Sequence, residues 1–188
     1  MDKRSEFPWV SLLFNILFSV YHIVFGVMEH SWWLFTVGNY YLVLSAVRFS
    51  VILTGRDGRF ITTFTGIMLM ILSVPLAGIA ILAVVKDRGT VIHEIAMISV
   101  AVYAFTKITL AAVNLVKSRR SCCAKERALR NISFAAAFVS IFSLRRSMLV
   151  SFGEMTAENI RLMNGATGTG VCVIVFLLGL NLLRHPKP

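Results

Sequence analysis

The sequence predicts an all-α integral membrane protein that crosses the bilayer six times. Only 15% of its 188 residues are charged and 57% are hydrophobic, whereas about a quarter of the residues in a soluble domain are charged. The mean hydropathy is +0.77. Six apolar stretches reach the length of roughly 20 residues that a transmembrane helix needs. We therefore expect one compact membrane domain over residues 1–188 and no sizeable soluble domain.

Short polar breaks such as "GRDGR" and "KDRGTV" separate the predicted spans. The spans cover residues 8–27, 32–54, 61–85, 92–116, 131–152 and 164–183. Pro8 suits the first turn of a helix. No small-x-small cleavage site follows this first run, which favours a retained helix over a signal peptide. Pro75 lies inside the third span, where the missing N–H predicts a kink.

Lysine and arginine collect in alternate connections between the spans. One side carries twelve of them: Lys3, Arg4, Arg56, Arg59, Lys117, Arg119, Arg120, Lys125, Arg127, Arg130, Arg184 and Lys187. The other side carries only Lys86, Arg88 and Arg161. The positive-inside rule then places both termini in the cytoplasm, for a multi-pass protein of the plasma membrane. This distribution assigns the net charge of +10 to the membrane surface rather than to nucleic acid.

Short sequence similarities suggest an internal repeat. The outward-running spans share "LFSVYH" at 17–22, "ILSVPL" at 71–76 and "IFSLRR" at 141–146, and the inward-running spans share "AVRF", "AVNL" and "GLNL". These matches predict three helical hairpins with pseudo-threefold symmetry, as in transporters built from repeats. Chance similarity between segments rich in serine, leucine and valine is the open alternative.

Four cations lie inside the predicted spans, whereas all nine acidic residues lie in loops, in tails or at span boundaries. The cations are Arg48, Lys107, Arg145 and Arg146. A charge in the bilayer core costs several kcal/mol unless it is paired or hydrated. These side chains must therefore reach the headgroups, line a wet cavity or bind an anion that the protein does not supply. Because adjacent helical positions differ by about 100°, Arg145 and Arg146 cannot face the same way.

If these cations bind an anion that the protein does not supply, we expect that ligand to be a small anionic or zwitterionic molecule. The predicted substrate-binding residues are Lys107, Arg145, Arg146, Arg48, His22, Asn114, Tyr103 and Tyr41. Arginine suits carboxylate or phosphate groups and lysine acts as a point charge. The amides and tyrosines fit a polar cavity, although interhelical packing is an open alternative for them. Trp32 and Trp33 are predicted to be interfacial anchors. No metal or cofactor motif is present, and we expect none of these residues to be catalytic.

The leading functional hypothesis is a transporter, channel or substrate-binding membrane subunit for such a solute, and not an enzyme. Two alternatives stay open: a non-catalytic assembly, sensing or immunity protein of the membrane, and an intramembrane enzyme acting on lipid or phosphate. Expected partners are the lipid bilayer and the ligand, which includes lipid headgroups. The basic segment 117–130 is interpreted as a membrane-surface segment, with a docking site for a protein partner as its alternative.

Overall fold

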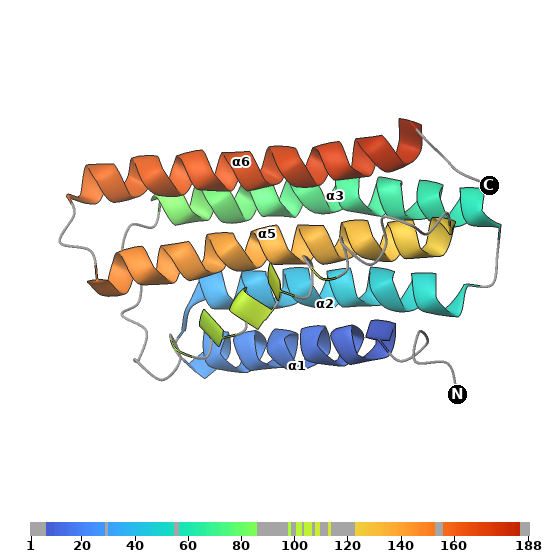
Figure 1. The fold of residues 1–188 in the computed structure, drawn as a ribbon. Helices are drawn as coiled ribbons and strands as arrows, with labels where there is room; N and C mark the ends of the chain where they lie inside the picture. The colour runs from blue at the N-terminus through green and yellow to red at the C-terminus, as the bar shows by residue number, and fades with distance from the viewer. Residues whose placement is uncertain are drawn as a thin grey trace.

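A computed structural model gives the fold of the chain (Figure 1). The residues it describes are 7–28, 30–54, 57–85, 98, 101–102, 104–106, 108–109, 113, 123–152 and 156–184. The long helices are α1 (Phe7–Met28), α2 (Trp32–Leu53), α3 (Gly58–Val85), α5 (Ala124–Phe152) and α6 (Ala157–Arg184). The described residues between 98 and 113 are helical as well, and no described residue lies in a strand.

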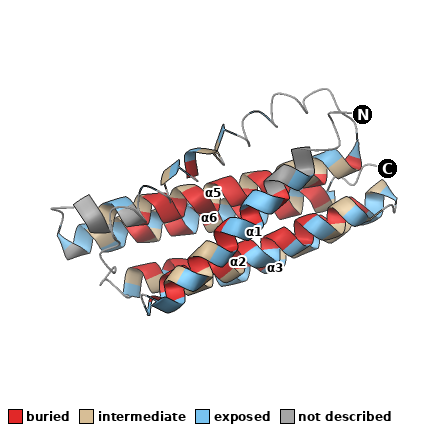
Figure 2. Cartoon of the chain, turned by 90° about the horizontal axis from the view of Figure 1, so that it is seen from below, coloured by how far each residue is buried: buried red, intermediate tan, exposed pale blue. Residues whose placement is uncertain are grey.

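Three of these helices are long and apolar enough to cross a membrane. They are α2, α3 and the part of α6 from Glu158 to Arg184. Leu12–Met28 of α1 is a shorter apolar helix. Large apolar side chains such as Val74 and Leu177 face outward, and Figure 2 shows exposed residues along the outer surfaces of the helices. These features identify an all-helical membrane protein, while the count of six spans stays a prediction.

The helices form a bundle of alternating direction. Helices α1, α3 and α5 run one way and α2 and α6 run the other way (Figure 1). The tightest pairs are α1 with α2 and α3 with α6, and α5 contacts α2, α3 and α6. We name the two ends of the bundle according to the orientation predicted from the sequence. The end that holds Leu53 and Arg184 is the inner end, and the end that holds Met28 and Phe152 is the outer end.

Glycines allow the closest helix contacts. A Cβ atom on Gly66 of α3 would lie 2.9 Å from the carbonyl oxygen of Gly179 on α6, and one on Gly179 would lie 2.8 Å from that of Gly66. In the α1–α2 pair, a Cβ on Gly26 would lie 2.6 Å from the backbone nitrogen of Phe35. Small residues at such crossings let backbones approach, which is a main source of helix association in lipid.

The turn from α1 to α2 contains a strained histidine. Ser31 N donates to Gly26 O at 2.8 Å and His30 N donates to Val27 O at 3.3 Å. This pair of bonds is the Schellman pattern that ends many helices. His30 occupies its left-handed position with φ of 49°, where glycine is the usual residue.

Helices α5 and α6 begin earlier than predicted, at residues 124 and 157 rather than 131 and 164. Glu126 and Glu158 lie in their first turns, where a negative charge stabilises a helix N-terminus. The helices thus extend past the apolar stretches that marked the predicted spans.

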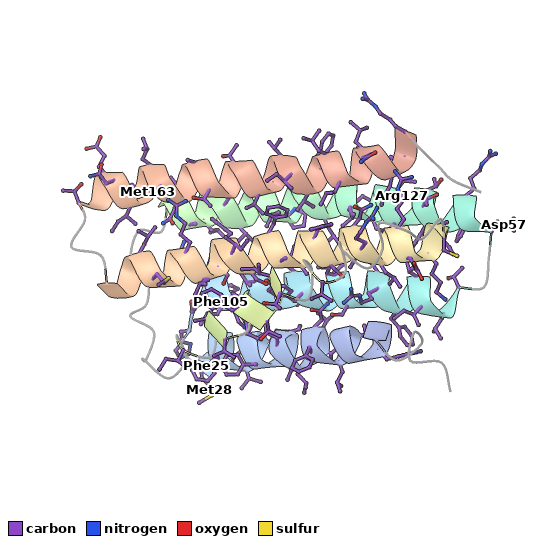
Figure 3. All side chains as sticks on the ribbon, in the orientation of Figure 1. Phe25, Met28, Asp57, Phe105, Arg127 and Met163 are labelled. Atoms are coloured by element: carbon purple, nitrogen blue, oxygen red, sulfur yellow. The ribbon has the colours of Figure 1, made fainter. Side chains whose placement is uncertain are left out.

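Residues 124–130 of the basic segment therefore belong to α5, and cations there bind the ends of other helices. Lys125 Nζ donates to Ile52 O of α2 at 2.7 Å. Arg127, labelled in Figure 3, donates to Asn181 O of α6 at 3.5 Å. Both carbonyls lie in the last turn of their helices, where cations are favourable partners.

Candidate functional site

The side chain of Arg146 lies inside the bundle between α5 and α2. It is only 7% exposed, and its guanidinium carbon lies 4.2 Å from the centre of the Trp33 ring. Trp33 is buried as well and meets Phe142 edge-on, with ring centres 5.5 Å apart. A guanidinium over an aromatic face is held by the ring quadrupole. The prediction that Trp33 is an interfacial anchor is therefore wrong, whereas Trp32 is 65% exposed.

Arg145 turns to a different helix. Its Nη1 atom donates to the carbonyl oxygen of Met163 on α6 at 3.3 Å, and Met163 is labelled in Figure 3. Thr167 Oγ1 donates to the same oxygen at 2.6 Å. The expected divergence of the two adjacent arginines is confirmed, with Arg146 directed to α2 and Arg145 to α6.

Arg48 of α2 lies near the inner end and is 2% exposed. Its guanidinium donates to Ser133 Oγ of α5 and to the Leu129 carbonyl oxygen, the latter at 3.5 Å. Both of these acceptors are neutral oxygen atoms of α5. Arg48 therefore joins α2 to α5 and adds a second buried positive charge to their interface.

Between these two arginines, a tyrosine and a serine link the same helices. The hydroxyl oxygens of Tyr41 and Ser140 are 2.8 Å apart, and both residues are buried. Ser140 donates its own proton to the Ala136 carbonyl oxygen at 2.8 Å. Each hydroxyl has one proton, so Tyr41 is the donor to Ser140.

We name the residues that form these contacts between α2 and α5 the α2–α5 seam. They are Trp33, Tyr41, Arg48, Ser133, Ser140 and Arg146. The polar contacts of the seam follow a common spacing. Tyr41 and Arg48 are seven residues apart on α2, and Ser133 and Ser140 are seven residues apart on α5. Seven residues are about two helical turns, so polar pairs meet at matching levels of two antiparallel helices.

His22 of α1 lies next to the seam. The His22 side chain is buried. Its ring centre lies 4.0 Å from the ring centre of Phe18 and 6.3 Å from the ring centre of Tyr41. Neither ring nitrogen forms a hydrogen bond of normal geometry with a described residue. Three predicted residues, Arg146, Tyr41 and Arg48, therefore lie along the seam at different levels, and His22 lies next to Tyr41.

Three other predicted residues lie outside the described part of the chain. They are Lys107, Asn114 and Tyr103. Trp33, Ser133 and Ser140 were missed as functional candidates. The seven-residue spacing of the two serines, matched by Tyr41 and Arg48, is a signal that could have found them.

A cavity of about 270 Å³ opens at the outer end of the α1–α2 pair. It is lined by Gly26, Val27, His30, Ser31, Trp32 and Phe35. None of these residues belongs to the seam, so the cavity is separate from the buried arginines. Within the described ranges, no group of three or more His, Cys, Asp or Glu is placed to hold a metal ion.

Comparison of the chain with protein-family models, with curated proteins and with solved structures finds no match. The fold and the seam define a helical membrane protein with buried cations, and any functional inference depends on its own residues.

Proposed function

We propose that the protein is a transporter, channel or substrate-binding membrane subunit that holds a small anionic or zwitterionic solute at Arg146. The observation that carries this proposal is the burial of Arg146 against Trp33, within a bundle whose predicted spans contain no interior carboxylate. A positive charge in such surroundings strongly favours an anion nearby, because the low dielectric strengthens attraction.

The chemistry of the guanidinium fits this role. A guanidinium group can bind a carboxylate or phosphate in a two-pronged manner, so the Arg146 side chain is of the type that would hold such a group. Arg146 lies six residues before the end of α5, or about 9 Å along the axis. A solute from the outer side would reach it after a short descent into the bundle.

The topology included in this proposal has six spans with both termini in the cytoplasm. The alternating direction of α1, α2 and α3 (Figure 1) supports it, as do the basic residues near the inner end, Arg59, Lys125, Arg127 and Arg184. The proposed protein is not an enzyme, and its ligand leaves the bundle chemically unchanged.

A thermal-shift screen of the detergent-purified full-length protein tests the proposal. The panel contains carboxylates, amino acids, inorganic phosphate and phosphate esters. A ligand at about 100 times its Kd stabilises the folded state by about 2.7 kcal/mol. We expect at least one anion to raise the Tm of the wild type and of Arg145→Gln, but not that of Arg146→Gln.

Arg145→Gln is the matched control because it removes an identical charge one position away that faces α6. The readout is the shift caused by ligand within each variant, so a change in basal stability does not affect it. An equal shift in Arg146→Gln, or no shift with any anion in the wild type, would contradict the proposal.

A further inference from the structure

The two buried arginines of the α2–α5 seam mark two separate levels of the bundle. The guanidinium of Arg48 contacts Ser133, and Arg146 lies thirteen residues further along α5. Thirteen residues of helix span about 20 Å. One small anion cannot contact both cations, so the proposed solute would have an outer site at Arg146 and an inner site at Arg48.

The bond between Tyr41 and Ser140 lies midway between these levels. Ser140 is seven residues from Ser133 and six from Arg146, which corresponds to about 10 Å and 9 Å of helix. Both hydroxyl groups are buried, and their oxygen atoms are 2.8 Å apart. This neutral, closed contact separates the two positive sites.

The bond also joins two different helices, so it breaks if they separate at this level. The broken bond would leave the Tyr41 hydroxyl group able to donate to a passing anion, while Ser140 keeps its bond to the Ala136 carbonyl oxygen. We infer that Tyr41 and Ser140 form a gate between an outer and an inner anion site. This inference rests on the proposed function, because it assigns the path that the same solute would take.

Flux measurements on proteoliposomes test the gate, with the anion identified by the thermal-shift screen. Tyr41→Phe and Ser140→Ala each remove the bond while keeping most of the packing. We expect either variant to raise passive anion flux about fivefold. One hydrogen bond contributes a net free energy of about 1 kcal/mol, and removing that amount from the closed state changes its population about fivefold. Anion binding in detergent is compared for Ser140→Ala, which should bind as the wild type does because Arg146 is unchanged.

Tyr40→Phe is the matched control. Tyr40 is the neighbouring tyrosine, is buried as well, and its hydroxyl has no hydrogen-bond partner among the described residues. We expect its flux to equal that of the wild type. Unchanged or lower flux in both gate variants, or an equal rise in Tyr40→Phe, would overturn the gate while Arg146-dependent binding still stood. Absence of any anion binding to the wild type would overturn the proposed function itself, and the gate with it.

Discussion

The guanidinium of Arg146 lies over the indole ring of Trp33, 4.2 Å from its centre. One residue is a buried cation of α5, and the other is a buried aromatic side chain from the facing helix α2. Their contact holds the guanidinium in the seam, at the position of the proposed anion site.

Replacement of Trp33 by leucine should weaken both the fold and the proposed ligand binding. We expect a loss of about 1 kcal/mol or more from the cation–π contact, together with lost packing against Phe142. Chemical unfolding in detergent measures the first effect and the ligand-induced thermal shift measures the second. Trp32→Leu is the control, since Trp32 is largely exposed; equal effects of the two changes would show that the contact contributes nothing specific.

Alanine at Gly66 or Gly179 should destabilise the α3–α6 pair. The new methyl group would lie within 3 Å of a backbone oxygen of the facing helix, and overpacking of this kind costs about 1–3 kcal/mol. Gly78 and Gly170 have open space around their Cβ positions, so alanine there should be neutral or stabilising by up to about 1 kcal/mol. The comparison of four melting temperatures checks this, and a uniform response would refute the close crossing.

Glycine at position 30 should stabilise the turn between α1 and α2. His30 adopts a left-handed conformation, which costs a residue with a Cβ atom about 1–2 kcal/mol. We expect His30→Gly to raise the Tm, whereas His30→Ala should not, because alanine keeps the Cβ atom. A higher Tm for the alanine variant than for the glycine variant would contradict the observed backbone geometry.

Removal of the Lys125 ammonium should destabilise the inner end of α2. Lys125→Met keeps the apolar stem and loses the hydrogen bond to the Ile52 carbonyl oxygen. A charge-assisted bond at a helix C-terminus contributes about 1 kcal/mol, and the loss should appear in unfolding experiments. Arg59→Met, which changes an exposed cation, serves as the comparison and should have a smaller effect.

Labelling of the native cysteines tests the proposed orientation. Cys123 is exposed at the start of α5, at the inner end, and Cys172 lies within α6. In a Cys122→Ser background, a membrane-impermeant maleimide should label Cys123 in inside-out vesicles and not in intact cells. Labelling from the outside of intact cells would reverse the assigned orientation.

The sequence predicted α1 and α2 to within one residue at each end, because turn-forming or polar residues bound their apolar stretches closely. It placed the starts of α5 and α6 too late, since both helices continue into polar residues beyond the apolar stretch. The three-hairpin repeat stays a prediction. Its aligned serines differ in their partners: Ser19 donates to Gly38 O of α2, whereas Ser73 donates to Met70 O of its own helix.

The site could be predicted only in part. Arg48, Arg146 and His22 stood out because polar groups are rare in such spans, and the helical angle required Arg145 and Arg146 to diverge. Which arginine faces the seam could not be predicted, because apolar residues and serines lie on both sides of the pair and the helix shows no distinct polar face. Trp33 was misplaced because α2 has large apolar side chains on its exposed face, such as Leu53, as well as on its buried face, such as Val37.

Direct titration of the stabilising anion into purified protein, followed by calorimetry, tests the central claim that Arg146 holds the solute. Loss of a charge-assisted contact worth about 1.5–3 kcal/mol predicts a Kd about 10 to 150 times weaker in Arg146→Gln than in the wild type. Arg145→Gln should retain the wild-type Kd. Equal affinities in all three proteins would contradict the account.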